Sequence, residues 1–258
     1  MKIGIVCPYD IARGGGVQEH VLAQAKGLQQ RGYEVKIITP KVRHQKMDLS
    51  GMLELIYVGN SAKVKTPIKT SLELGVSLSR DAVDDMLANE AFDLLHIHEP
   101  EVPLLGAQIV AKAICPVVAT FHAIHPQTPM ARTIETFRIP YSRSIFSRLT
   151  ELTAVSNPAA EFVKERTGRT VHIIPNGIDL TKYNFRPKAK AAAHKTILYV
   201  GRLEKRKGLS YLLKAYRLLA EQRSDVSLVL IGDGELRSSL EDTIKNKKIP
   251  RVTFLGYV

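Results

Sequence analysis

The sequence has no tryptophan, only two cysteines, and an aromatic content of 6%. So few aromatic side chains leave little to stack on nucleobases, and no helix-turn-helix or zinc-finger pattern is present, so nucleic acid is an unlikely partner on composition. Cys7 and Cys115 are far apart, each in or beside an apolar segment. We expect both to be reduced core residues, not a disulfide or a metal site.

Long hydrophobic runs are also missing. No apolar stretch approaches the length of a membrane span, and the apolar run 3–7 before Pro8 is too short for the core of a signal peptide. We therefore expect a cytoplasmic protein that could contact a membrane only peripherally.

Charge is abundant and unevenly distributed. The net charge is +12, and residues 175–258 contain 17 Lys and Arg against 8 Asp and Glu, whereas residues 1–174 contain 20 against 17. The C-terminal part thus holds +9 of the +12. Such asymmetry indicates anionic partners, either phosphates or acidic lipid head groups.

The chain opens with a strand–helix–strand pattern. Residues 2–7 read as a buried strand, three glycines at 14–16 precede helical spacing over 17–28, and 35–39 reads as a second strand. This order predicts a parallel sheet. The glycines do not make the dinucleotide fingerprint, because Glu19 occupies its third position, which disfavours a nicotinamide-dependent enzyme.

The same alternation continues to the end of the chain and predicts two Rossmann-like domains, residues 1–174 and 175–258. In the first domain we expect further strands at 53–58, 92–97, 116–121, 152–155 and 171–174, and helices at 79–89, 104–113 and after Asn157 as N-cap. In the second domain we expect strands at 197–200, 227–231 and 252–255, and helices at 209–222 and 235–246. Three strands are about half of a usual doubly wound sheet.

Polar residues directly after predicted strands are candidate site residues, because ligands bind at the carboxyl ends of parallel strands. His122 follows one strand, and Arg202 follows Gly201 at the end of another. Lys205 and Arg206, in the same basic loop, are expected to be solvated. His96 and His98 share a strand face and could bind a metal, but no third ligand has a recognisable spacing, so hydrogen-bonded histidines are the simpler interpretation.

Several stretches together resemble the retaining glycosyltransferases of family 4, and most closely the phosphatidylinositol mannosyltransferases. These stretches are KIGIVCPY at 2–9, GGVQ at 15–18, LHIHEP at 95–100, VATFH at 118–122, PNG at 175–177, and Gly201-Arg202 with Lys207-Gly208. The resemblance spans the chain and implies the GT-B fold, two Rossmann-like domains of which the second is incomplete here.

The resemblance also implies the roles of individual residues. His122, Arg202 and Lys207 would be catalytic, the two cations stabilising a leaving diphosphate in place of a metal. The residues implied in binding a GDP- or UDP-sugar donor are Gly15, Gly16, Asn176, Arg202, Lys207 and Gly232. Those implied in binding a lipid, saccharide or polyol acceptor are Tyr9, Gln18 and Glu101. No metal or other cofactor is implied, and transfer would proceed with retention by front-face attack.

The sequence departs from the family in three places. Glu101 and Gln127 replace groups suited to an anionic inositol phosphate, and acidic residues at 81–85 replace a basic membrane-binding helix. The family's Glu-x7-Glu element does not occur, so we expect a truncated chain that binds donor weakly and turns over little. The competing hypothesis is a non-catalytic basic module that binds anionic membrane or nucleic acid.

Overall fold

A computed structural model of the protein describes residues 1–41, 53–65, 71–76, 80–102, 105–122, 142–182 and 193–257. It contains two compact units, Met1–Lys182 and Tyr183–Val258. The division follows Lys182, not the predicted residue 174. Residues 175–182 go with the first unit. Within them, Asn176 hydrogen-bonds to His20 of that unit.

The first unit is built on one eight-stranded sheet of order β4-β3-β2-β1-β5-β6-β7-β8. The strands are β1 (Lys2–Val6), β2 (Glu34–Lys41), β3 (Glu54–Lys65), β4 (Ser71–Val76), β5 (Leu94–His98), β6 (Val117–Phe121), β7 (Glu151–Ala154) and β8 (His172–Ile173). All neighbours are parallel except β3 and β4. The strand order reverses between β1 and β5, which is where α/β folds bind ligands.

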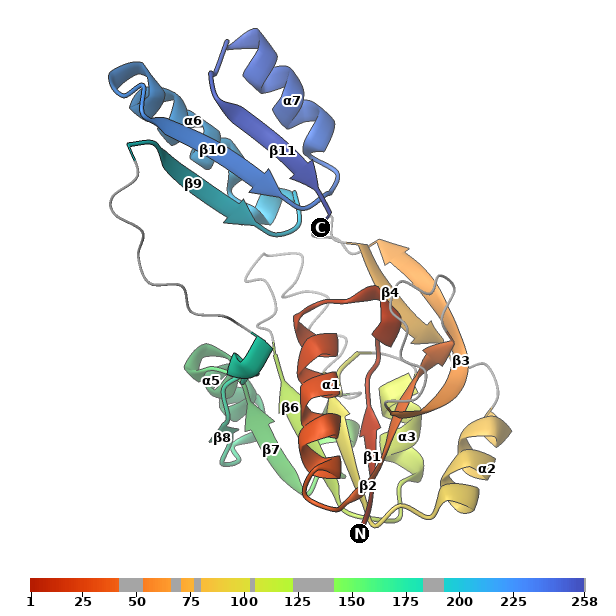
Figure 1. Cartoon of the computed structure of the whole chain (residues 1–258). Coiled ribbons are helices and arrows are strands. Elements are labelled where there is room, and N and C mark those ends of the chain that lie inside the picture. Colours follow the sequence, from red (N-terminus) through yellow and green to blue (C-terminus); the bar gives the residue numbers. More distant parts are fainter. Residues whose placement is uncertain are drawn as a thin grey trace. The chain divides into compact units, whose positions relative to one another are not determined.

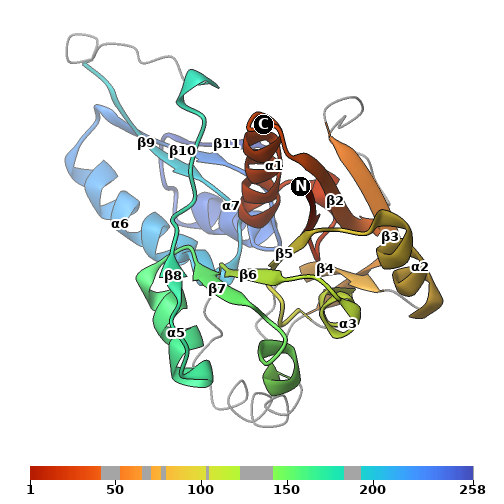
Figure 2. The ribbon, with the colours of Figure 1, turned by 90° about the horizontal axis from the view of Figure 1, so that it is seen from below.

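Helices cover both faces of this sheet, as Figures 1 and 2 show. Helix α1 (Gly16–Gln29) packs on one face, and α2 (Arg80–Glu90), α3 (Leu105–Lys112) and α5 (Asn157–Thr167) contribute to the core of the other. Successive side chains of a strand point to opposite faces of the sheet, so each strand contributes to both cores. Ile5 lies in the core under α1, whereas Val6 lies in the core on the opposite face. The predicted buried parallel sheet is confirmed.

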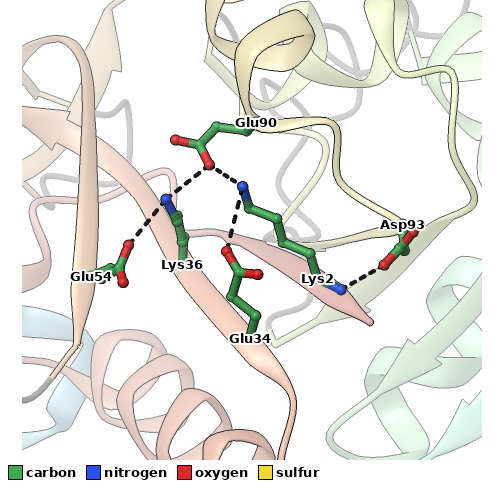
Figure 3. Close-up of polar contacts among 6 residues, drawn as sticks. All are labelled: Lys2, Glu34, Lys36, Glu54, Glu90 and Asp93. Carbon is green, nitrogen blue, oxygen red and sulfur yellow. Dashed lines mark hydrogen bonds and ion pairs between the residues drawn. The ribbon is translucent and has the colours of Figure 1, made fainter.

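The amino ends of the strands are held by ion pairs, which we call the amino-edge cluster (Figure 3). Glu90, the last residue of α2, accepts Lys2 at 2.6 Å and Lys36 at 3.0 Å. Lys2 also lies 3.5 Å from Glu34, and Lys36 lies 3.0 Å from Glu54. Hydrogen bonds from Lys2 and then Lys36 lower the pKa of Glu90, so this cluster ties the end of α2 to the starts of β1 and β2.

The second unit contains a three-stranded parallel sheet of order β11-β10-β9 in the described residues. Its elements are β9 (Lys195–Val200), α6 (Leu209–Gln222), β10 (Val226–Ile231), α7 (Arg237–Asn246) and β11 (Val252–Gly256). The predicted helix 209–222 is confirmed at both ends. Leucines at its helical spacing, Leu209 and Leu213, pack with Leu228 and Leu230 of β10.

Three expectations need comment. The N-cap of α5 is Ser156, whose side chain accepts from the N–H of Ala159, and not Asn157, because Asn157 and Pro158 already occupy the first turn. Gln127 lies outside the described residues. Cys7 and Cys115 are both free thiols, as expected.

No helix in the described part of the chain combines the length and hydropathy needed to cross a bilayer.

Candidate active site

The predicted site residues of the first unit gather at the carboxyl edge of its sheet. β1 leads into Tyr9, β5 ends at His98, and β6 ends directly before His122. Because β1 and β5 flank the point where the strand order reverses, the loops after them lie at the edge where α/β folds bind ligands.

A glycine turn opens α1 at this edge. Gly15 is the N-cap residue, with a φ of 151° and no side-chain cap, so the first N–H groups of α1 are not capped by a side chain. A Cβ at Gly15 would lie 2.6 Å from Oε1 of Gln18, whose Nε2 donates to the carbonyl of Asp10 at 3.3 Å. The φ favours glycine, and a side chain at this position would also displace the Gln18 amide. An uncapped helix start suits an anionic group such as phosphate.

Four histidines lie next to this turn. Along β5, Leu95 and Ile97 enter the core opposite α1, so His96 and His98 point toward α1, and their rings stack at 4.8 Å with an interplanar angle of 4°. The Nδ1 atom of His98 lies 2.9 Å from Nε2 of His122. The ring of His20 packs edge-on against His98 at 5.3 Å and His122 at 5.1 Å.

These histidines are neutral at pH 7. Burial, with smaller contributions from neighbouring histidines, lowers the pKa of His96 and of His122 to about 4. Burial also lowers the pKa of His98 well below its ordinary value, and that of His20, although a hydrogen bond to Asn176 opposes the shift at His20. This hydrogen bond brings the predicted donor-binding residue Asn176 to the histidines.

The metal alternative for His96 and His98 gains no support from geometry. Within the described ranges, no group of three or more His, Cys, Asp or Glu is arranged to hold a metal ion. The ring nitrogens of His96 are instead 2.7 Å from Nε2 of Gln24 and 2.6 Å from Oγ1 of Thr120. The expected hydrogen-bonded histidines are confirmed.

Glu99 is a functional candidate that the sequence analysis did not single out. It has a φ of 50°, rare for a residue other than glycine, and its Oε1 accepts the backbone N–H of His122 at 2.8 Å. Burial and then Glu99 raise the pKa of the Tyr9 phenol, so Tyr9 lies near this carboxylate. A strained backbone at a strand end is a common mark of functional sites.

Glu101, a predicted acceptor-binding residue, lies in a buried ion pair. Its Oε1 accepts Nη1 of Arg166 at 2.8 Å and the hydroxyl of Ser142 at 3.0 Å. The Glu101 residue is 4% exposed. Because Arg166 neutralises this carboxylate, the predicted repulsion of an anionic acceptor by Glu101 is weakened.

In the second unit, the basic loop after β9 contains the predicted cations. Nη1 of Arg202 lies 3.0 Å from Glu204, whose other oxygen accepts Nε of Arg206 at 2.9 Å. Arg206 is therefore ion-paired, and not simply solvated as predicted. The side chain of Glu204 is only 10% exposed, whereas that of Arg202 is 50% exposed. Glu204 thus orients Arg202 and leaves other guanidinium N–H groups available to an anion.

Gly232 lies against the same loop. A Cβ at Gly232 would lie 2.0 Å from the carbonyl oxygen of Gly201, so the turns after β9 and β10 touch backbone to backbone. Leu203 also donates its N–H to the carbonyl of Asp233 at 3.0 Å. The structure therefore brings predicted donor residues Arg202 and Gly232 into adjacent turns. Lys207 is exposed just before Gly208, the N-cap of α6, which has no side-chain cap.

Comparison with solved structures defines the fold class as GT-B. A structure from Anabaena, Alr3699/HepE in complex with UDP and glucose, matches with a TM-score of 0.73 and 20% identity over 100% of this chain and 70% of that chain. A sucrose-phosphate synthase from Thermosynechococcus elongatus matches with a TM-score of 0.71 and 19% identity, covering 100% of this chain and 70% of that one. In the part of the chain that the structure describes, the second sheet contributes three strands to this fold.

The chain belongs to Glycosyltransferase Family 4, whose model matches residues 14–182, and the Glycosyl transferases group 1 model matches residues 182–258. A phosphatidyl-myo-inositol mannosyltransferase of Mycolicibacterium smegmatis is 34% identical over 100% of this chain and 65% of the relative. An uncharacterized glycosyltransferase of Methanocaldococcus jannaschii is 27% identical over 100% of this chain and 70% of that relative. The chain thus spans slightly less than two thirds of the length of the mycobacterial relative.

Proposed function

We propose that the protein transfers a hexose from a nucleotide sugar to a lipid or saccharide acceptor, with retention and without a metal. The observation that carries this proposal is that the uncapped glycine turn at Gly15 and the neutral His122 lie at the same edge of the sheet. The glycine turn suits a phosphate, and His122 suits the hydroxyls of a sugar. Membership of the glycosyltransferase family supports the same chemistry.

The chemistry needs charge stabilisation at the leaving group. When the bond between the anomeric carbon and the diphosphate breaks, negative charge develops on the departing oxygen, and Arg202 and Lys207 would stabilise it. The acceptor oxygen bonds to the same face of the anomeric carbon, and its proton passes to the leaving diphosphate. No carboxylate nucleophile is required, which agrees with the buried ion pair that engages Glu101.

Mannose and an inositol phospholipid are the donor sugar and acceptor that the mycobacterial relative's name favours. The acceptor could otherwise be a saccharide or a polyol. The pairing of Glu101 with Arg166 removes one objection to an anionic head group. UDP in the Anabaena complex and the mannosyltransferase relatives together support a nucleotide-sugar donor, and the choice between GDP and UDP is left to binding assays.

Arg202→Ala tests the proposed leaving-group role. In the full-length protein, this substitution should lower turnover by about 10²- to 10³-fold, the scale for removing one preorganised charge stabiliser. Arg206→Ala is the matched control, because Arg206 has the same charge, the same Glu204 partner and the same 50% exposure. Equal losses in the two variants, or an unchanged rate in Arg202→Ala, would refute the assigned role.

Peripheral membrane contact is supported by a groove between α6 and α7. The groove has a volume of about 460 Å³ and is lined by leucines, of which Leu218 is exposed, by the hydroxyl residues Ser210, Ser239 and Thr243, and by Lys214, Arg217 and Lys247. Apolar surface rimmed by cations suits an anionic bilayer. Lys214→Glu with Arg217→Glu should weaken sedimentation with phosphatidylserine vesicles at low salt, whereas the exposed pair Lys164→Glu with Arg148→Glu should not. Equal binding by all three proteins would contradict this surface.

A further inference from the structure

A continuous row of hydrogen bonds runs beneath α1 from a backbone carbonyl to His122. Its members, in order, are the carbonyl of Ala119, Thr153, Thr120, His96, Gln24, His98 and His122. Each link joins residues far apart in sequence, so the fold, not local structure, assembles the row. Because each neutral hydroxyl or imidazole has a single proton to donate, the direction of every bond follows from the first.

The carbonyl of Ala119 can only accept, so it fixes the direction. The hydroxyl of Thr153 donates to this carbonyl at 3.1 Å and has no second proton for Thr120. The hydroxyl of Thr120 must therefore donate to Thr153 at 2.6 Å. Thr120 then accepts from Nε2 of His96 at 2.6 Å, which places the proton of neutral His96 on Nε2.

Gln24 passes the same donor-to-acceptor direction on to the next ring, His98. Since Nδ1 of His96 carries a lone pair, it accepts from the amide Nε2 of Gln24 at 2.7 Å. The amide oxygen of Gln24 then accepts from Nε2 of His98 at 2.9 Å. Nδ1 of neutral His98 is left as an acceptor, and only an Nε2–H on His122, 2.9 Å away, can complete the row. The opposite amide orientation would leave the two threonine hydroxyls facing each other without a proton.

We propose that Gln24 is a positioning residue that sets the tautomer of His122, holding its proton on Nε2 and its lone pair on Nδ1. The consequence for catalysis rests on the proposed function. The Nδ1 atom of His122 would accept a hydrogen bond from a sugar hydroxyl and face positive charge at the anomeric carbon, but would donate no proton to the substrate. Burial of the rings keeps them neutral, as the row requires. Glu99 fixes the backbone of the same residue through its N–H.

The test is the tautomer of His122, read from two-bond ¹H–¹⁵N correlations of the histidine-labelled protein at pH 7.5. We expect Nε2–H in the wild type, with His122 assigned by its absence in His122→Asn. Gln24→Leu should give a mixture of the two tautomers, because His98 loses the acceptor that orients it. Gln30→Leu, an exposed glutamine at the C-cap of the same helix, should leave the wild-type spectrum.

Gln24→Glu provides a second variant that keeps an acceptor toward His98. It should retain Nε2–H on His122, while His96 gains a second proton on Nδ1, because a carboxylate can only accept and favours a charged imidazole beside it. In the full-length enzyme, kcat should fall about tenfold in Gln24→Leu, with an unchanged KM for donor, and recover in Gln24→Glu. Tenfold is the lower end of the cost of removing the partner that orients a metal-bound histidine, which we take as the scale for this uncomplexed ring.

An Nδ1–H tautomer in the wild type, or an unchanged His122 signal in folded Gln24→Leu, would overturn the proposal. The spectra need no substrate. A confirmed tautomer in a protein that transfers no sugar would therefore reject the proposed function and leave the positioning role intact.

Discussion

The amino-edge cluster and the histidine row, which lie at opposite ends of the first sheet, hold their polar side chains in different charge states. At the amino edge, Lys2, Lys36 and Glu90 form ion pairs while each keeps about a fifth of its side chain exposed. At the carboxyl edge, His98 is fully buried and its hydrogen-bond partners are neutral. Partial exposure lets charges remain solvated, whereas burial favours neutral groups with every bond satisfied.

The difference separates stability from function. Among the described residues, the ion pairs at the amino edge join α2 to strand starts and include none of the proposed site residues. The neutral row at the carboxyl edge ends on His122, for which we propose a catalytic role. Substitutions at the amino edge should therefore leave transfer unchanged, and those at the carboxyl edge should lower it.

His122→Ala is the strongest test of this separation. Loss of the ring should lower kcat about 10²-fold in the full-length protein, because a preorganised group beside developing charge is removed. The melting temperature and kcat are measured together. Glu90→Gln is the control from the opposite edge and should leave kcat unchanged. If the two variants lose kcat equally, the separation fails.

The pH dependence of stability should also distinguish the two edges. The folded-state pKa of His96 and His122 is about 4, below the ordinary value of 6.5, so the unfolded chain binds protons first as the pH falls. The free energy of unfolding is therefore retained above pH 6.5 and lost between 6.5 and about 4, by roughly 1.4 kcal/mol per pH unit for each histidine. Glu90, whose pKa is lowered from 4.5, contributes to the loss only at lower pH.

Urea denaturation at pH 7.5, 6.5, 5.5 and 4.5 measures this slope. His122→Asn should make it shallower, and His194→Asn, a change at an exposed histidine, should not. A wild-type stability that stays constant from pH 7.5 to 4.5 would contradict neutral histidines in the fold.

Glu90→Gln should have the smallest effect, a loss of about 1 kcal/mol in the free energy of unfolding at pH 7, because the cluster is partly exposed. The loss should shrink in 1 M salt, which screens the lysines. Asp85→Asn, on the exposed face of the same helix, makes the same charge change without an ion pair. A salt-independent loss, or an equal loss in Asp85→Asn, would show that the amino-edge cluster does not act through charge.

Local patterns predicted much of the fold. The regular spacing of leucines predicted both ends of α6. His122 was predicted as a site residue because it directly follows a buried strand. The antiparallel strand β4 was missed, since its pairing with β3 is decided by contacts between strands and not by its own pattern.

The missed site residues depend on the tertiary fold in the same way. Gln24 appears in sequence as one residue of an amphipathic helix, and only the packing of α1 on β5 brings it to His96 and His98. Glu204 lies among four cations and reads as one member of a charged loop. Its side chain is only 10% exposed in the folded protein, and this burial makes it the residue that orients Arg202. The burial depends on the tertiary fold and not on the local sequence.

The most direct test of the central claim is a thermal-shift titration of the full-length protein with GDP- and UDP-hexoses, run beside anionic vesicles and oligonucleotides. A donor-binding glycosyltransferase predicts that at least one nucleotide sugar raises the melting temperature in a saturable manner, and that Arg202→Ala weakens this shift. No shift with any nucleotide sugar, together with salt-sensitive binding to vesicles or oligonucleotides, would contradict the claim and favour a non-catalytic basic module.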